Sequence, residues 1–310
     1  MSLSWAYYRV KPFIPWRARI ALRRWLAARI RAKCDGYWPI YECSGTAPRN
    51  FPGWPEGKRF AFVLTHDVES RIGMERVREL VELEAQFRFR ASFNFVPEGR
   101  YETPADLRQW LRDRGVEIGV HDLRHNGKLF DSRAKFQQSA GRINHYLREW
   151  QAVGFRAAFM HRKLDWLHEL EIAYDSSSFD TDPFEPQPEG VHTIFPFWCA
   201  PEGGKGGYVE LPYTLPQDST LFLVLEEQGI DIWREKLDWI VERGGMALLN
   251  VHPDYMCLSD KPTRNEYPAA MYMNFLNYVR STYAGQYWHA LPHEVADYVR
   301  PAIARSAMVV

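Results

Sequence analysis

Hydrophobic and polar positions along this chain form two kinds of pattern, one typical of buried strands and one typical of helices, and the two alternate. Short apolar runs, typical of buried strands, occupy residues 60–67, 90–96 and 116–121. Each run is followed by a stretch with the three-to-four-residue apolar spacing of a helix. These helical stretches lie at 75–87, 105–115 and 134–151. A strand and helix repeat of this kind predicts a parallel α/β sheet or barrel.

The same order continues toward the carboxyl terminus. Strand-like segments lie at 154–161, 172–179, 207–215 and 246–252, and helical ones at 164–171 and 231–244. No glycine-rich fingerprint follows the first strand, where an open dinucleotide-binding sheet would need one. We therefore predict a (β/α) barrel of seven or eight strands. The expected divisions are a basic arm with a Pro/Gly-rich connector at 1–58, the barrel at 59–300 and a tail at 301–310.

Ionisable residues stand at the carboxyl end of almost every predicted strand. In parallel sheets and barrels these ends gather at one face, where the loops are free to carry chemistry. Structural ion pairs can explain one or two such endings, but eight favour a catalytic pocket. The eight residues are Asp67, Glu69, His121, His125, Arg156, Asp175, Asp218 and His252.

The carboxylates of the first strand are two residues apart. Side chains alternate along a strand, so Asp67 and Glu69 can face the same side. One carboxylate of such a pair can hold a cation while the other accepts a proton from water. The alternative is that both form salt bridges with arginines such as Arg71 or Arg156.

Two histidines follow the third strand in the segment VHDLRHNG. His121 and His125 have the spacing that puts two imidazoles on one face of a helix or tight turn, which suits a metal. Two imidazoles and one carboxylate leave positions open for water and substrate, as in a catalytic metal site. Zinc is the default ion, and cobalt, nickel, manganese or iron would accept similar ligands. A pair of surface histidines without a metal is the alternative.

The remaining strand ends suggest supporting roles. His252 follows the very apolar segment MALLNVH and is a candidate general acid. Arg156 can orient Asp67 or clamp a substrate. Asp175, Asp180 and Asp182 are candidates for ordering His252 or the substrate loop, and turn formation is an equally good explanation for each of them.

Charge and cysteine content exclude some classes of function. Lys plus Arg equals Asp plus Glu at 39 each, so the chain has no global charge that would attract nucleic acid. The four cysteines lie far apart without CxxC spacing, which indicates neither a zinc ribbon nor a disulfide scaffold. A reducing, cytoplasmic compartment fits this pattern.

The first 33 residues contain nine Lys or Arg and no acid, without the apolar core of a signal peptide. No apolar run in the chain approaches the roughly 18 residues that span a bilayer. Arg19 and Arg23 interrupt the one apolar helical face of this arm. Peripheral contact with the inner membrane face, and a solvated basic helix packed on the domain, remain the two interpretations. The apolar residues of that face are Trp16, Ile20, Leu26 and Ile30.

Six segments, taken in order, resemble a known family. THDVE, HDLRH, FRAA, YDSS, ELPYTLPQD and LLNVHP resemble the motifs of the polysaccharide deacetylases, also called the NodB-homology or carbohydrate esterase family 4 enzymes. The resemblance covers about Arg59 to Tyr255. It implies a distorted (β/α) barrel that removes N-acetyl groups from amino sugars, using a divalent metal held by one carboxylate and two histidines.

The resemblance assigns roles to individual residues. The catalytic base maps onto Asp67, the metal-binding histidines onto His121 and His125, the motif arginine onto Arg156 and the last histidine onto His252. The family usually has two adjacent aspartates in its first motif, whereas here a valine separates the two carboxylates. The third metal ligand is therefore either Asp67 or the carboxylate two residues later. The arginine motif, RAAF, also lacks its usual proline and aromatic residue.

The implied reaction is hydrolysis of an acetamido group, in which Asp67 removes a proton from water and His252 protonates the departing amine. A cytoplasmic location favours an acetylated glycan precursor, such as a nucleotide-linked or lipid-linked sugar. Candidates for contact with the sugar are Asp180, Asp182, Asp218 and the tryptophans Trp54, Trp166 and Trp198, with Phe197.

Two other functions are compatible with the same motifs. One is hydrolysis of another C–N amide bond, such as a cyclic imide or ureide, without a strongly held metal. The other is a glycan-binding or assembly protein whose barrel has lost activity. Metal content discriminates the metal-independent amide hydrolase from the deacetylase. Acetate release from any acetylated sugar excludes the inactive binding protein.

Overall fold

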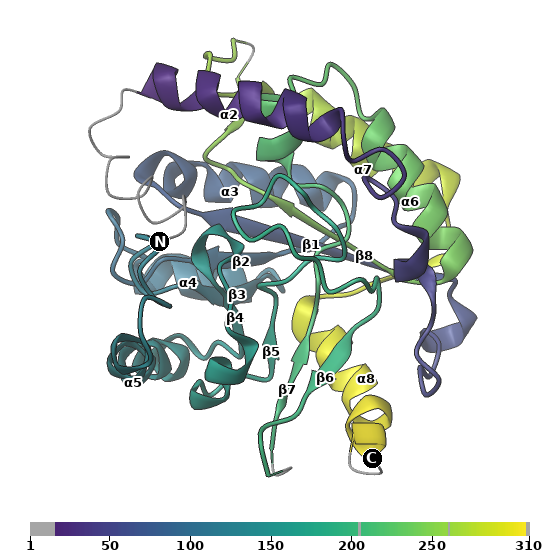
Figure 1. The fold of residues 1–310 in the computed structure, drawn as a ribbon. Coiled ribbons are helices and arrows are strands. Elements are labelled where there is room, and N and C mark those ends of the chain that lie inside the picture. Colours follow the sequence, from purple (N-terminus) through teal and green to yellow (C-terminus); the bar gives the residue numbers. More distant parts are fainter. Residues whose placement is uncertain (1–15, 204–205, 260, 308–310) are drawn as a thin grey trace.

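The computed structural model describes residues 16–203, 206–259 and 261–307 (Figure 1). At its centre is strand β1 (Phe60–Val68), in which every residue is buried. The run is apolar up to Leu64 because neighbouring strands flank it on both sides and helices cover it. The strands that follow in the same sheet are β2 (Ser92–Phe95), β3 (Glu117–His121), β4 (Gly154–Arg156), β5 (Tyr174–Asp175), β7 (Tyr208–Glu210), β8 (Met246–Val251) and β11 (Tyr287–His289).

These strands form one curled sheet in the order β11-β1-β2-β3-β4-β5-β7-β6, with β8 on the other edge of β1. All neighbours are parallel except β6 (Phe197–Cys199), which runs antiparallel to β7. An isolated bridge between Leu215 and Leu249 joins the far end of the sheet back to β8. The sheet is therefore a distorted barrel, and the α/β class and the barrel predicted from the sequence are confirmed.

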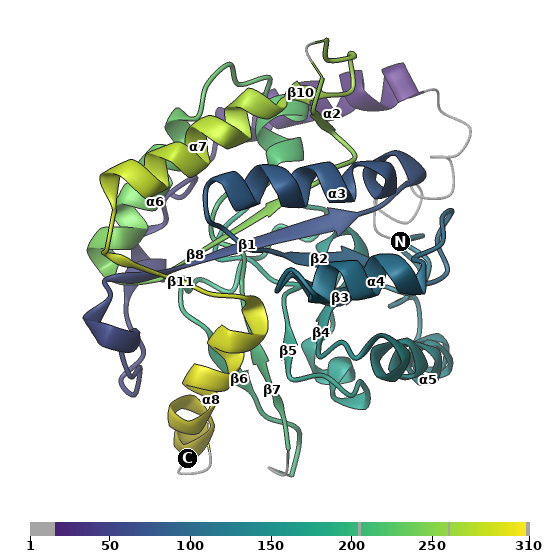
Figure 2. The ribbon, with the colours of Figure 1, turned by 180° about the vertical axis from the view of Figure 1, so that it is seen from behind.

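Helices connect successive strands and cover the outer face of the sheet (Figure 2). Side-chain caps begin two of them, because the hydroxyls of Ser70 and Ser132 accept hydrogen bonds from free N–H groups of the first turn. Gly244 ends the helix before β8 in a left-handed conformation, φ 73°. The helices are α3 (Arg71–Gln86), α4 (Ala105–Arg112), α5 (Arg133–Trp150), α6 (Asp231–Arg243), α7 (Ala269–Thr282) and α8 (Pro292–Ala307).

Three of the predicted strands are much shorter than their apolar patterns indicate. Strands β4, β5 and β7 have two or three residues each, and the stretch 164–171 contains a 3-10 helix, η5 (Leu164–Glu169). Side-chain oxygens accept some of the backbone hydrogen bonds that a longer ladder would have made. Ser177 Oγ accepts a hydrogen bond from Ala157 N at 2.8 Å, and the Glu210 carboxylate accepts one from Ser178 N at 3.0 Å. Short pieces elsewhere are η2 (Glu42–Gly45), η3 (Pro55–Gly57), η4 (Ala158–Met160), β9 (Met256–Cys257) and β10 (Tyr267–Pro268).

The described part of the amino-terminal arm packs on the barrel. Helix α2 (Trp16–Arg31) lies against the π-helix η6 (Ser219–Val224). The connector after it is fastened at two points, since Lys236 Nζ donates to Pro39 O at 2.6 Å and Trp54 Nε1 donates to Gly244 O at 2.8 Å. Within the described residues, no helix combines the length and apolarity needed to cross a membrane.

Candidate active site

Strand ends from across the sheet bring the candidate residues together. Asp67 lies at the end of β1, His121 closes β3, and Arg156 closes β4. Parallel pairing puts His121 opposite Arg156 in the register. His252 follows β8, which pairs with β1 on its other side. The sheet therefore delivers residues that are far apart in sequence to one place.

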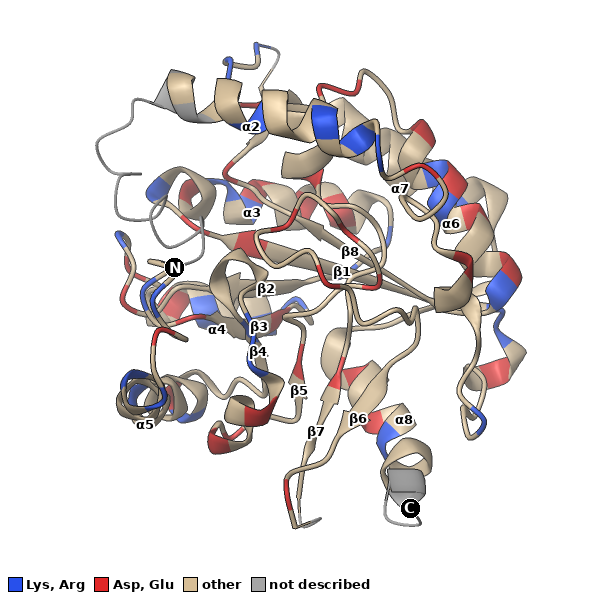
Figure 3. Cartoon of the chain, viewed as in Figure 1, with Lys and Arg blue, Asp and Glu red and all other residues tan. Residues whose placement is uncertain are grey.

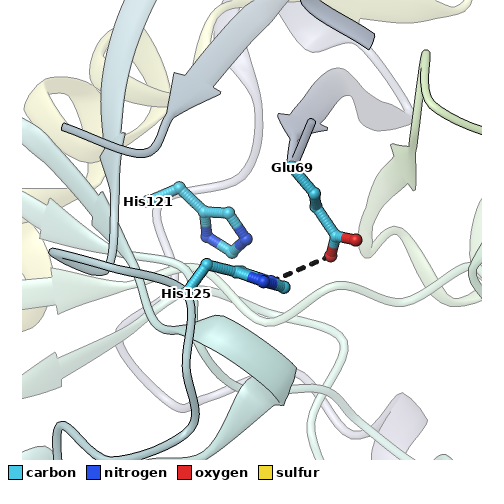
Figure 4. A group of neighbouring side chains, drawn as sticks. All are labelled: Glu69, His121 and His125. Carbon is cyan, nitrogen blue, oxygen red and sulfur yellow. Dashed lines mark ion pairs between the residues drawn. The ribbon is translucent and has the colours of Figure 1, made fainter. Parts of the chain in front are cut away.

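Glu69, His121 and His125 form a cluster with the geometry of a metal site (Figure 4). One ligand atom from each residue lies within 4.8 Å of the other two. His121 Nδ1 is 3.1 Å from the Arg156 carbonyl oxygen, to which it donates when it carries the ring proton. This tautomer leaves the lone pair of Nε2 directed at the cluster, and that buried nitrogen has no hydrogen-bond partner.

His125 reaches the cluster through a tight turn rather than a helix. Asp122 and His125 have left-handed backbones, φ 58° and 47°. The Asp122 carboxylate accepts hydrogen bonds from Leu123 N and Arg124 N, which stabilises this unusual path. The Phe159 ring then packs on the imidazole of His125, with ring centroids 4.5 Å apart.

Glu69 supplies the carboxylate of the cluster. Its Oε1 lies 3.0 Å from His125 Nε2, and this contact is not aligned as a hydrogen bond. Its Oε2 accepts from the Tyr255 hydroxyl at 3.0 Å, and its backbone N–H donates to the Asp254 carboxylate at 2.9 Å. Two imidazole nitrogens and one carboxylate oxygen that converge in this way form a donor set that fits a divalent metal. Burial opposes the charge of Glu69, but His125 outweighs it and the pKa is held well below its usual range.

Asp67 lies beside this cluster and is held by two amides. Its two carboxylate oxygens accept hydrogen bonds from Asn94 Nδ2 and Asn250 Nδ2, both at 2.9 Å. Its Oδ2 is 4.0 Å from His121 Nε2 and 3.5 Å from Arg156 Nη1. Burial raises the pKa of Asp67, but the Arg156 guanidinium and the neighbouring histidines outweigh it and lower the pKa below its ordinary value. The cluster of converging ligand atoms contains Glu69 and not Asp67, so its geometry favours Glu69 as the third ligand.

His252 is fixed on the other side of the cluster. Its Nδ1 lies 2.7 Å from Asp218 Oδ1, and its backbone N–H donates to Asp218 Oδ2 at 2.8 Å. The Tyr267 hydroxyl also donates to Asp218. The free nitrogen, Nε2, is 3.8 Å from Glu69 Oε1. Burial lowers the pKa of His252, but Asp218 outweighs it and the pKa rises to about 10.

The structure gives other predicted site residues internal partners. Asp218, suggested as a sugar contact, is fully buried and binds His252. Asp175, suggested as a residue that orders His252, instead accepts two hydrogen bonds from Ser177, through its backbone N–H and its Oγ. Asp175 also lies opposite Glu210 in the register of β5 and β7, and burial raises the pKa of both carboxyls.

Asp180 and Asp182 are buried as well. Asp180 forms an ion pair with Lys236 at 2.6 Å, and both side chains are at most 1% exposed. Asp182 accepts from Tyr213 OH at 2.8 Å and from the backbone N–H of Phe184 at 3.0 Å. These partners explain both aspartates as supports of the loop that follows β5.

The tryptophans suggested for sugar stacking pack in the core. Trp54 is buried, and Trp198 packs against the same apolar cluster at β6 and β7. Trp166 packs against Phe130 and Phe136. Among the described residues, the aromatic rings that contact the metal-type cluster include Phe159, which packs on His125, and Tyr255, whose hydroxyl donates to Glu69.

Several residues of the site carry no separate signal in the sequence analysis. Asn94, Asn250, Asp254 and Tyr255 all contact Asp67 or the carboxylate of the cluster. Asn250 has one usable signal, because it stands two residues before His252 and so faces the same side of β8. The others come from loops or from a neighbouring strand, so that only the folded chain shows their role.

Solved structures share this architecture. A protein from Mycobacterium smegmatis, described provisionally as a polysaccharide deacetylase, is similar over 83% of this chain and 95% of its own, with a TM-score of 0.60 and 20% sequence identity. The chain has the polysaccharide deacetylase fold. No protein-family model matches the sequence, and no curated protein matches it significantly.

Two further solved structures are less similar to this chain. The peptidoglycan deacetylase PdaC from Bacillus subtilis is 9% identical over 83% of this chain and 98% of its own, with a TM-score of 0.46. A carbohydrate esterase family 4 pseudoenzyme from Bacillus anthracis is 12% identical over 79% of this chain and 67% of its own, also with a TM-score of 0.46. In general a fold does not by itself determine activity, so the function rests on the residues of the site.

Proposed function

We propose that the protein is a metal-dependent hydrolase that removes the acetyl group from an N-acetylated sugar of a glycan or glycan precursor. The observation that carries this proposal is the cluster of Glu69, His121 and His125, with ligand atoms within 4.8 Å of one another. An oriented carboxylate, Asp67, and an oriented imidazole, His252, lie on either side of it. A structural ion pair between His125 and Glu69 does not account for His121 Nε2, which is buried beside it without a hydrogen-bond partner.

Glu69, His121 and His125 would hold the ion, which is zinc by default, with cobalt, nickel, manganese or iron as alternatives. When bound, such an ion acts as a Lewis acid that polarises a carbonyl group and acidifies water. The hydrogen bond to the Arg156 carbonyl sets the ring orientation of His121, and Tyr255 and Asp254 hold Glu69.

Asp67 acts as the general base in this proposal. Arg156 keeps it ionised, and Asn94 and Asn250 hold its carboxylate plane in one orientation. It therefore accepts a proton from the water that attacks the acetyl carbonyl. The lone pairs left free by the two amides are the ones available for this transfer.

His252 acts as the general acid. Asp218 binds its Nδ1 and leaves Nε2 facing the cluster. An amide nitrogen is a poor leaving group until it is protonated, and His252 Nε2 delivers that proton to the departing amine. The two proton-transfer groups thus come from β1 and β8, which are neighbours in the sheet.

The test combines metal content with acetate release. The protein is purified without a metal-affinity tag, loaded with zinc, cobalt or nickel, desalted and measured by mass spectrometry. We expect close to one ion per chain, lost in the His121→Ala/His125→Ala variant and retained in His145→Ala, which changes a histidine outside the cluster. Acetate release from a panel of N-acetylated amino sugars should occur in the proteins that retain the metal and be lost in the His121→Ala/His125→Ala variant.

Two results would contradict the proposal. Absence of metal after loading would leave the metal-independent amide hydrolase, to be tested with cyclic imides and ureides. Stoichiometric metal without acetate release from any substrate, combined with saturable glycan binding, would indicate the inactive binding protein.

A further inference from the structure

Helix α2 has its charged side turned toward the protein. Arg24 Nε donates to Leu223 O at 3.0 Å, and Arg24 Nη1 lies 2.8 Å from the Glu226 carboxylate. Arg31 pairs with Glu227, and Ala27 between the two arginines is buried. Positions 24, 27 and 31 share one face of a helix. The docked face is therefore held mainly by ion pairs and hydrogen bonds.

The opposite face of α2 exposes large apolar side chains. Leu22, Trp25 and Leu26 are 43%, 49% and 44% exposed. Of seven large apolar side chains that are exposed among the described residues, these three share just over one turn of a single helix. Single exposed apolar side chains are normal on a protein surface, but a contiguous stripe of this kind marks an interaction site.

Positive charge accompanies the stripe. Arg29 continues it one turn later, and its guanidinium lies 3.6 Å over the Trp25 ring. The sixteen residues of α2 contain six arginines and no acid, and Figure 3 shows basic positions in the middle and toward the carboxyl end of the helix. Tryptophan, leucine and arginine on one helix face are typical of a helix that lies in the interface of a bilayer with anionic lipids.

We propose that the face of α2 formed by Leu22, Trp25, Leu26 and Arg29 docks the protein on the surface of an anionic lipid bilayer. The apolar side chains enter the headgroup boundary, and Arg29 contacts lipid phosphates. A second copy of the chain fits this face less well, because a symmetric dimer through α2 would bring its arginines together. Of the apolar face that the sequence predicts, Leu26 belongs to this stripe, whereas Ile20 and Ile30 are half-buried. The side chain of Trp16, the fourth residue of that face, lies outside the described part of the structure.

The docking face lies on the same helix as a residue close to the site. Burial raises the pKa of the Asp182 and Glu185 carboxyls, and the Arg23 guanidinium of α2 opposes this rise. Tyr213 OH contacts both of these carboxyls, which places them in one cluster. Gln217 donates to Glu185 and accepts from Asn250, which holds Asp67, so hydrogen bonds connect this cluster to the site. Docking of α2 on a bilayer therefore suits an acetylated sugar carried on a lipid. Only this extension to a lipid-linked substrate rests on the proposed deacetylase function.

The test is co-sedimentation of the full-length protein with vesicles. Phosphatidylcholine vesicles are compared with vesicles in which about a third of the lipid is phosphatidylglycerol, at low and high salt. The test variant is Leu22→Gln/Trp25→Gln/Leu26→Gln, and a second variant is Arg29→Glu. The matched control is Val153→Gln, which changes a side chain of similar exposure (41%) on another part of the surface.

We expect binding to the anionic vesicles that weakens with salt, falls at least about tenfold in the triple variant and severalfold in Arg29→Glu, and is unchanged in the control. Circular dichroism and thermal unfolding establish that the variants are folded. Absence of binding by the wild type, or equal binding by the triple variant, would overturn the proposal. So would a wild-type dimer in size-exclusion chromatography that the triple variant abolishes without vesicles, because the stripe would then be a subunit interface. None of these readouts depends on deacetylase activity.

Discussion

The buried ion pair between Lys236 and Asp180 allows a sharp test of whether Asp180 supports the fold or contacts the sugar. Lys236 Nζ contacts Asp180 Oδ2 and the carbonyl of Pro39, both at 2.6 Å, with no exposed lysine surface. Replacing the lysine with methionine keeps much of its volume but leaves the aspartate buried without its counter-charge. Breaking a buried pair in this way costs about 3–5 kcal/mol of unfolding free energy.

Protonation of Asp180 limits this cost. Burial already raises the pKa of Asp180, and Lys236 opposes the rise in the wild type. In Lys236→Met the folded-state pKa rises further above the ordinary value of 3.8. Protonating Asp180 costs about 1.4 kcal/mol for each pH unit by which the pH exceeds its ordinary pKa of 3.8. At pH 7 the difference is roughly three units, so the cost is at most about 4 kcal/mol. At pH 5 the same limit is about 2 kcal/mol.

The sign of the pH dependence follows from this rise. The folded variant binds a proton more tightly than the unfolded chain, so the variant loses stability as the pH increases from about 4 through the folded-state pKa. Relative to wild type, Lys236→Met should therefore be much more destabilised at pH 7 than at pH 5. The double variant with Asp180→Asn should lose most of this pH dependence.

Urea unfolding in the presence of EDTA measures the effect without a contribution from bound metal. A loss of about 4 kcal/mol shifts the midpoint by roughly 1.3 M if the urea dependence is about 3 kcal/mol per molar. The matched control is Lys135→Met, which breaks an exposed pair with Asp131 and should cost less than about 1 kcal/mol. A Lys236→Met penalty that is below 1 kcal/mol, or that does not change between pH 5 and pH 7, would refute the reasoning.

Two further predictions test the site itself. In a competition titration with a chelator, Glu69→Gln should weaken zinc binding by at least about 100-fold, and Asp67→Asn should weaken it less than tenfold. The reason is that only Glu69→Gln removes the charge of a metal ligand. The reverse order would make Asp67 the third ligand. Asp218→Asn should lower the kcat of acetate release by about 10²–10⁴-fold without changing the zinc content. The cause is that His252 loses the carboxylate that orients its ring and sets its tautomer. An unchanged kcat would exclude His252 as the general acid.

The sequence by itself determined the succession of strands and helices and the residues at the strand ends. Hydrophobic spacing is a local property, so the pattern of 60–67 and 75–87 predicts β1 and α3 without knowledge of the rest of the chain. The chemistry of parallel strand ends is also readable, because strands of one direction must end at one face. This is why Asp67, His121 and His252 were identified as members of one site.

Only the tertiary structure decided which side chains touch. The choice of Glu69 for the cluster depends on Tyr255 and Asp254, which lie more than 180 residues away in sequence. The partner of His252 is Asp218, 34 residues earlier, and that of Asp180 is Lys236, 56 residues later. Such contacts depend on strand register and on the irregular closure of the barrel. Both arise from the packing of the whole domain, so no periodic pattern in the sequence indicates them.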